Sequence, residues 1–172
     1  MIRVQREDFD LGRELAALTA GNHKVGGLAV FVGLVRDMAG HGAGHGAGHG
    51  AGHGAGDETV GAMTLEHYPG MTEKMLEKIE REARERWPLE ASLVIHRYGR
   101  LEPGDQIVLV ACASAHRQAA LEACGFLIDW LKTKAPFWKL EEGPKGAQWV
   151  EARASDDTAA RRWAKEEPDA AE

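Results

Sequence analysis

The sequence predicts an α+β fold in which helices pack on a largely antiparallel sheet. Two observations indicate this class. Short runs rich in β-branched residues alternate with longer runs of helical periodicity, and two adjacent strands are joined by a tight turn. The chain has 172 residues, of which 44% are hydrophobic and 28% charged, so one domain can bury a core. We assign residues 1–154 to this domain and residues 155–172 to a polar C-terminal tail.

The first part of the chain is predicted to form a strand, a helix and a buried strand. Residues 2–6 alternate as a short strand, and Asp10 is placed to cap a helix whose leucines share one face until Gly21 stops it. Residues 26–36 are flanked by glycine and rich in β-branched side chains, which is typical of a buried strand.

A low-complexity insert over residues 37–58 follows this strand. It contains H-G-A-G four times, and because glycine is unfavourable in helices we interpret it as a flexible loop. Neutral imidazoles can bind nickel, zinc or copper, but glycine spacers fix no geometry. A repeat expansion is therefore the favoured interpretation, and a metal site is the alternative. The histidines concerned are His41, His45, His49 and His53.

The rest of the domain is predicted to add two helices and five strands. A strand over residues 59–68 leads through a Pro-Gly turn into a helix that ends at Trp87. Strands over residues 91–98 and 106–113 are joined by L-E-P-G-D, whose proline and glycine suit a hairpin turn.

A long helix over residues 116–134 follows, and Pro136 forbids its continuation. Short strands are predicted at residues 137–141 and 148–152, and the polar tail is expected to be a peripheral helix or partly disordered.

Two lysines lie on either side of Pro136 among aromatic and apolar residues. They are Lys132 and Lys139. A lysine partly withdrawn from water has a lowered pKa and can exchange protons near neutral pH, so both are candidates for acid–base chemistry. The alternative is that they cap carbonyls at a helix end and complement the helix dipole.

A candidate anion site lies where a strand meets the long helix. Ser114 is suited to cap that helix, and His116 and Arg117 open it, so N–H groups, the dipole and a guanidinium all favour a phosphate. Arg36 ends an earlier strand and is a further candidate, for which an ordinary surface ion pair with Asp37 is the alternative.

Composition excludes several classes of function. A formal net charge of −6 gives no broad basic face for nucleic acid. Cys112 and Cys124 are too few for a disulfide framework, so we expect reduced core residues. No apolar run approaches the roughly 18 residues of a membrane span, and the N-terminus lacks a signal-peptide core. We therefore expect no membrane association and a cytoplasmic location.

Six blocks of the sequence, spread over about residues 2–163, resemble the large, catalytic subunit of molybdopterin synthase. They are F-V-G-L-V-R-D at 31–37, L-E-H-Y-P-G-M at 65–71, H-R-Y-G-R-L-E-P-G-D at 96–105, S-A-H-R at 114–117, L-K-T-K-A-P-F-W-K-L-E at 131–141 and W-V-E-A-R at 149–153. The resemblance implies an α/β hammerhead-like fold and a homodimer. It also implies a small ubiquitin-like sulfur-carrier partner, with two carriers in a heterotetramer, and no cofactor.

The activity that this resemblance implies is sulfur transfer. The carrier's C-terminal thiocarboxylate would give its sulfur to cyclic pyranopterin monophosphate, and two rounds would form the dithiolene of molybdopterin. Lys132 and Lys139 would be the catalytic pair. The implied substrate-binding residues are Leu34, Val35, Arg36, His116, Arg117, Leu140, Glu141 and Arg153, the last from the dimer partner.

The sulfur is expected to arrive on another protein. The chain ends P-D-A-A-E rather than Gly-Gly, and its cysteines do not suggest persulfide chemistry. Two other classes stay open: a metal-handling module centred on the histidine repeat, and a phosphate-ligand binding protein without catalysis. The remaining histidines, His23, His67 and His96, are interpreted as structural.

Overall fold

The computed structural model describes residues 1–36, 62–143, 146–150 and 162–163. These residues form eight strands and three helices, at or close to the predicted positions except for one short strand that the sequence did not reveal. In chain order they are β1 (Ile2–Gln5), α1 (Leu11–Thr19), β2 (Gly27–Leu34), β3 (Ala62–His67), α2 (Met71–Arg86), β4 (Leu89–Arg97), β5 (Gly99–Leu101), β6 (Gln106–Ser114), α3 (Arg117–Lys134), β7 (Phe137–Gly143) and β8 (Gly146–Val150).

The strands form two sheets, whereas the sequence predicted one. The first sheet has the order β1-β4-β6-β2, in which β1 and β4 are parallel and the other neighbours antiparallel. The second sheet has the order β5-β3-β7-β8 and is antiparallel throughout. The α+β class with largely antiparallel pairing is therefore confirmed, and the single sheet was wrong.

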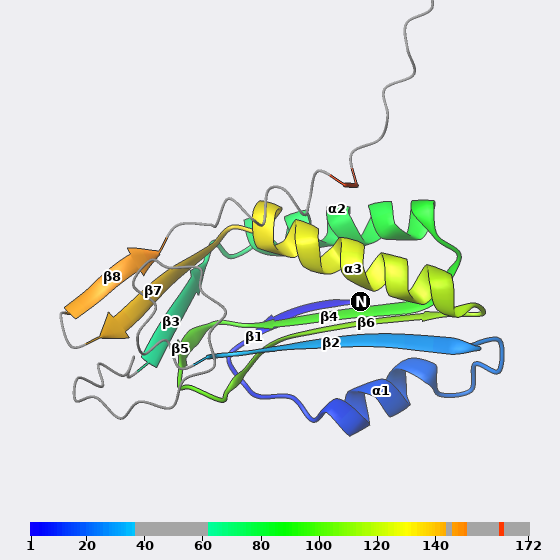
Figure 1. Ribbon diagram of the computed structural model, residues 1–172, viewed down its shortest axis with the longest axis horizontal. Helices are drawn as coiled ribbons and strands as arrows, with labels where there is room; N and C mark the ends of the chain where they lie inside the picture. The colour runs from blue at the N-terminus through cyan, green and yellow to red at the C-terminus, as the bar shows by residue number, and fades with distance from the viewer. Residues whose placement is uncertain (37–61, 144–145, 151–161, 164–172) are drawn as a thin grey trace, which may run out of the picture.

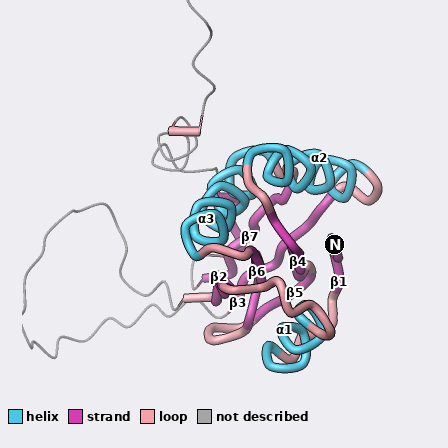
Figure 2. The backbone as a smooth tube through the Cα atoms, turned by 90° about the vertical axis from the view of Figure 1, so that its right-hand side faces the viewer, coloured by secondary structure: helices cyan, strands magenta, loops and turns pink. Residues whose placement is uncertain are grey.

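Helices cover both faces of the first sheet, and the second sheet extends beyond one end of it (Figure 1). The end-on view shows α2 and α3 on one face and α1 on the other (Figure 2). Side chains alternate along a strand, so β4 sends Val94 toward α2 and α3 and Ile95 toward α1. No helix in the described ranges is long and apolar enough to cross a lipid bilayer.

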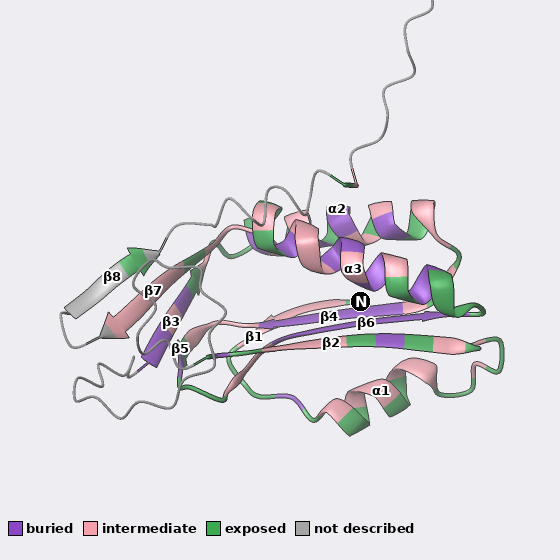
Figure 3. Ribbon diagram, viewed as in Figure 1, coloured by how far each residue is buried: buried purple, intermediate pink, exposed green. Residues whose placement is uncertain are grey.

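The main core lies between the first sheet and the pair α2 and α3. Buried residues run along β4 and β6 and along the inner sides of both helices (Figure 3). Phe126 of α3 is fully buried there, and burial of a side chain of this size contributes about 1.5–3 kcal/mol. Cys112 and Cys124 are free and buried in the same core, as predicted.

The predicted hairpin is confirmed for β4 and β6, which pair antiparallel with Ile95 opposite Leu109. Between them, the chain forms the unpredicted strand β5, which pairs with β3 and so ties the two sheets together. The turn after β5 has Gly104 at a φ of 94°, a conformation that glycine adopts without strain. The Asp105 N–H donates to the Glu102 carbonyl at 2.9 Å and closes this turn.

The starts of α1 and α3 can be compared with the predicted N-cap residues, Asp10 and Ser114. The Asp10 side chain accepts a hydrogen bond from the Arg13 N–H at 2.8 Å, so the first cap is confirmed. The second was wrong, because the N-cap of α3 is His116. Ser114 instead ends β6 fully buried, and its hydroxyl donates to the Pro88 carbonyl at 2.8 Å.

Arg162 and Trp163 contact the helices. The Trp163 ring lies 5.7 Å from the rings of both Trp87 and Phe126, and Arg162 forms an ion pair with Asp129 at 2.6 Å. The segment predicted as a polar tail therefore includes an aromatic residue packed on α2 and α3. The rest of that tail, and the insert over residues 37–58, lie outside the described residues.

Candidate active site

Lys139 lies on the inner face of β7 beside a carboxylate. Lys139 and Glu141 project from the same face, on which the neighbouring strand β3 buries Met63 and Leu65. The Lys139 Nζ lies 2.5 Å from the Glu141 Oε1, and 32% and 18% of the two side chains are exposed. The contact is a half-buried ion pair. It fixes the ammonium while leaving part of it open to a ligand.

The end of β2 lies close to Lys139 and Glu141. Val35 is buried in one cluster with Met63 and Leu65, the residues that lie opposite Glu141 and Lys139. Its N–H donates to the Asp105 carbonyl at 2.9 Å, which anchors the chain as it leaves β2. The neighbouring Leu34 and Arg36 are exposed. The structure therefore brings Val35, Lys139 and Glu141 together, with Arg36 next in the chain.

Lys132 lies in the last turn of α3, at the end of the helix that leads into β7 (Figure 1). Its side chain is exposed. The expectation that this lysine is withdrawn from water is therefore wrong for the single chain. Its position near the helix C-terminus also complements the dipole, as the alternative interpretation held.

Leu140 points away from this site. It alternates with Lys139 and Glu141 along β7, and it lies opposite Trp149 of β8. Trp138 and Trp149, which are 49% and 58% exposed, share its face. Only the backbone of Leu140 lies between the site residues.

His116 and Arg117 lie at the other end of α3. Both are exposed, and Gly27, which opens β2, approaches the helix so closely that a Cβ there would come within 3.1 Å of the Arg117 Cα. Fifteen helical steps separate Arg117 from Lys132, which is about 22 Å along the axis. Within one chain, the predicted phosphate clamp and the predicted lysine pair are therefore two separate groups.

Other predicted ligands cannot be placed. Arg153 and the four histidines His41, His45, His49 and His53 lie outside the described residues. The described ranges contain no group of three or more His, Cys, Asp or Glu side chains arranged to hold a metal ion.

A stack of rings beside Lys139 was not recognised from the sequence. The His67 ring lies 4.4 Å from Tyr98 and 6.2 Å from Phe137, and Phe137 stacks on His96 at 3.7 Å. Phe137 opens β7 two residues before Lys139. The only signal in the sequence was that both histidines fall in the distinctive blocks at residues 65–71 and 96–105.

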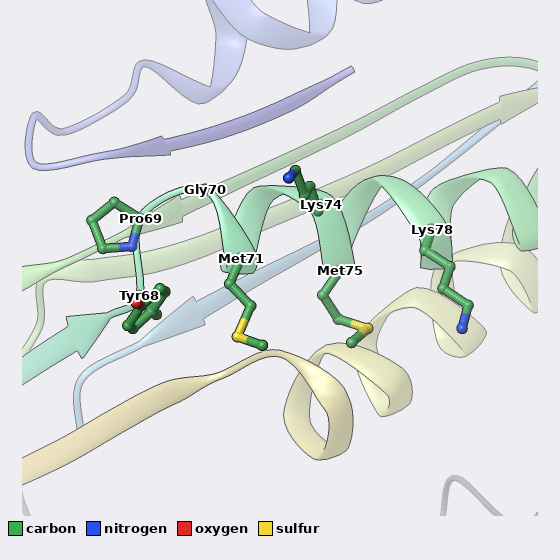
Figure 4. Close-up of a pocket in the computed structure, with 7 residues that line it drawn as sticks. All are labelled: Tyr68, Pro69, Gly70, Met71, Lys74, Met75 and Lys78. Atoms are coloured by element: carbon green, nitrogen blue, oxygen red, sulfur yellow. The ribbon is translucent and has the colours of Figure 1, made fainter.

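A shallow groove of about 530 Å³ lies at the start of α2 (Figure 4). Lys74 and Lys78 line it together with apolar side chains, so it is amphipathic and cationic. No sequence argument singled it out as a site. Its remaining lining residues are Tyr68, Pro69, Gly70, Met71 and Met75.

The fold and the site define a class: an α+β protein in which a half-buried lysine–carboxylate pair lies where the end of β2 meets the second sheet. The family model described as "MoaE protein" matches residues 4–134, and the chain belongs to this family.

Relatives and solved structures agree with this assignment. The chain is 54% identical over 162 residues to a molybdopterin synthase catalytic subunit of Pseudomonas aeruginosa, covering 94% of this chain and 97% of that protein. A "Molybdopterin biosynthesis MoaE protein" from Burkholderia ambifaria matches with a TM-score of 0.74 and 51% identity, over 95% of this chain and 97% of that chain. A complex of subunits 1 and 2 of molybdopterin-converting factor from Helicobacter pylori shares the fold at 19% identity, with a TM-score of 0.66 over 88% and 91% of the chains. The fold class expected from the resemblance is thus confirmed.

Proposed function

We propose that this chain is the catalytic subunit of a molybdopterin synthase. It takes sulfur from the C-terminal thiocarboxylate of a small carrier subunit and adds it to cyclic pyranopterin monophosphate, forming the dithiolene of molybdopterin. The observation that carries the proposal is the half-buried pair of Lys139 and Glu141 beside Val35, in a chain of the MoaE family.

The pair suits the charge that develops during sulfur transfer. The carrier sulfur bonds to the pterin side chain as an oxygen leaves, and hydrolysis of the acyl–sulfur linkage then leaves the sulfur on the pterin. Lys139, fixed by Glu141, stabilises the negative oxygen that forms in these steps. The exposed Lys132 meets the incoming carrier tail and assists proton transfer. In this proposal Leu34, Val35 and the backbone of Leu140 contact the substrate beside these lysines.

The clamp for the substrate phosphate is completed by a second copy of the chain. Arg36 follows Val35 in the chain, but His116 and Arg117 lie at the far end of α3, about 22 Å from Lys132. A homodimer removes this separation if the start of α3 in one subunit meets the end of α3 in the other.

One edge of the molecule has the surface that such a dimer needs. In the described ranges β2 pairs only with β6, so its outer edge carries backbone donors and acceptors available to another strand. Three aliphatic side chains of β2, those of Leu28, Val30 and Leu34, are 38%, 38% and 52% exposed. An apolar strand edge of this kind favours strand pairing with another chain.

The flank of α3 continues this surface. Arg117, Leu121, Ile128 and Lys132 recur at helical spacing, so they share one side of the helix. Leu121 is 63% exposed in the middle of the stripe, and cations lie at its two ends. Because α3 packs on β2 and β6, this stripe and the β2 edge form one face, which we call the β2–α3 edge.

A two-fold axis through the β2–α3 edge brings the lysines of one subunit close to the predicted phosphate clamp of the other. Antiparallel pairing of β2 with its copy places the start of one strand opposite the end of the other. Since Gly27 packs against Arg117, the partner's Arg117 then approaches Leu34 and Arg36. Each of the two sites thus combines lysines of one subunit with the His116 and Arg117 clamp of the other.

The full assembly contains this homodimer and two carrier subunits in a heterotetramer, and it works in the cytoplasm. The Helicobacter pylori structure is a complex of subunits 1 and 2 of molybdopterin-converting factor, and one chain of it has this fold, which supports a partner subunit. Arg153 of the partner subunit is a further substrate contact in this proposal.

The test mixes purified protein, thiocarboxylated carrier and cyclic pyranopterin monophosphate and measures molybdopterin. We expect two sulfurs per pterin and no product with unmodified carrier. Lys132→Ala should abolish product while the dimer and carrier binding persist, and Lys24→Ala, an exposed lysine before β2, should match the unmodified protein. Normal turnover by Lys132→Ala would refute the role of Lys132.

A further inference from the structure

His67 carries a polar atom that its packing does not explain. Only 8% of its side chain is exposed, and its Nδ1 has no hydrogen-bond partner among the described residues. The ring lies between Tyr98 and Phe137, where phenylalanine would pack as well and leave no nitrogen unsatisfied. A histidine at this position therefore indicates a use for the nitrogen beyond packing.

The carboxylate of Glu73 is oriented toward this ring. One Glu73 oxygen accepts the Gly70 N–H at 2.6 Å in the N-terminal turn of α2. The other lies 3.9 Å from the His67 Nδ1. The helix cap thus holds a carboxylate beside the ring, in the position of a carboxylate that orients a histidine.

The strand register places His67 next to Lys139. His67 of β3 lies opposite Phe137 of β7, and Leu65 lies opposite Lys139. His67 and Lys139 are therefore diagonal neighbours on one face, and such neighbours are about 7–8 Å apart. Because both side chains extend from the same face of the sheet, a substrate with an intervening water can contact both of them.

Resting on the proposed function, we propose that His67 is a second proton-exchanging residue of the sulfur-transfer site, working with Lys139 and oriented by Glu73. Lys139 gives an ammonium proton to the oxygen that leaves the pterin. Neutral His67 takes a proton from the water whose oxygen bonds to the acyl carbon as the carbon–sulfur bond breaks. The imidazolium returns this proton to Lys139, so both residues regain their starting states and protons balance.

The charged and titratable groups around His67 are few. Glu73 of α2 lies beside the His67 Nδ1, Lys139 of β7 is its diagonal neighbour, and the Tyr98 ring packs against it. His96 of β4 is fully buried, and its neutral Nδ1 donates to the Arg97 carbonyl at 2.8 Å, so it adds no charge near neutral pH. Arg6 lies over the Tyr98 ring, 4.9 Å from the ring centre.

The test compares the pH dependence of single-turnover molybdopterin formation in the assembled synthase with His67→Phe and His67→Gln. A base that is already protonated accepts no proton, so the rate of the unmodified protein should fall toward acid pH. Both variants should be slower by about 10²–10⁴-fold at pH 7.5 and should lose this acid-side fall. His96→Phe removes a ring nitrogen from the same stack, and the acid-side fall should persist in it.

The outcomes separate this inference from the proposed function. If the unmodified protein forms no molybdopterin, the proposed function fails. If it is active, and His67→Phe or His67→Gln keeps both its rate within twofold and its pH profile, the role of His67 is wrong. His67→Gln covers the case in which the phenylalanine variant fails to fold.

Discussion

The Lys139 ammonium lies 2.5 Å from the Glu141 carboxylate on the inner face of β7. The pair is only partly exposed, so each charge needs the other more than it would on an open surface. Glu141 is also what keeps the long Lys139 side chain in one place. This ion pair is therefore the part of the site that forms within a single chain, without residues of a partner subunit.

Replacement of Glu141 by Gln should impair catalysis more than folding. The amide removes the counter-charge and frees Lys139, so the rate of molybdopterin formation should fall about 10- to 100-fold. The free energy of unfolding should fall by about 1–2 kcal/mol, because the pair is partly screened by solvent. Glu66→Gln, on the exposed face of the neighbouring strand β3, is the matched control. A Glu141→Gln protein with an unchanged rate would show that Lys139 needs no partner.

His96 should make stability depend on pH. Desolvation, reinforced by repulsion from His67 and opposed by the hydrogen bond to the Arg97 carbonyl, lowers the pKa of His96 from 6.5 to about 4. Between these values the unfolded chain binds more protons than the folded one. Stability is therefore fully present above pH 6.5 and is lost as the pH falls toward 4, by on the order of 3 kcal/mol.

Urea unfolding at pH 7 and pH 5 measures this effect. The unmodified protein should be less stable at pH 5, and His96→Phe, which keeps the stack on Phe137, should lose much of that difference. An equal difference in both proteins would assign the pH dependence to other groups.

Gly26 should not tolerate a side chain. A Cβ at this position would collide with the carbonyl oxygen of Ala115, which is backbone and cannot move aside cheaply. Gly26→Ala should therefore lower the free energy of unfolding by about 1–3 kcal/mol and disturb the adjoining start of α3. Thermal melts would measure this. The control is Gly12→Ala in α1, where the Cβ meets only Asp10 at 3.4 Å and should stabilise the helix by about 0.5–1 kcal/mol.

Leu121→Glu should break the proposed homodimer. The side chain is 63% exposed in the single chain, so the monomer should remain folded, but a glutamate at this position would be buried in the interface without a partner for its charge. Sedimentation velocity should show a dimer dissociation constant raised by about 100-fold or more. Met71→Glu changes a residue of similar exposure, 56%, outside the β2–α3 edge, and this variant should stay dimeric. A dimeric Leu121→Glu protein would place the interface elsewhere.

The parts of the fold that local chemistry dictates could be predicted. The Asp10 cap, the Gly104 turn and the end of α3 before Pro136 each depend on neighbours within a few residues. The strand β5 could not be predicted, because three residues carry no periodicity and its stability comes from pairing with β3, far away in the chain. The second sheet likewise depends on pairing between distant segments, because β3 pairs with β7.

The residue types of the site could be predicted from the sequence, and so could part of their arrangement. The two-residue spacing of Lys139 and Glu141 on a strand already puts both on one face. The separation of Arg117 and Lys132 could also be predicted, because one predicted helix contains both residues. This separation excludes a cleft that combines the two residues within a single chain. The surroundings of His67 were not available, since Tyr98 and Phe137 come from other strands.

Subunit mixing tests the central claim, that each site combines residues of two chains. Lys139→Ala and Arg117→Ala subunits, each inactive alone, are co-expressed and assayed with thiocarboxylated carrier. In a shared site, half of the dimers are mixed and each has one intact site out of two. Molybdopterin formation should then recover to about a quarter of the unmodified rate. No recovery, with mixed dimers shown to form, would place Lys139 and Arg117 in the same chain's site and contradict the account.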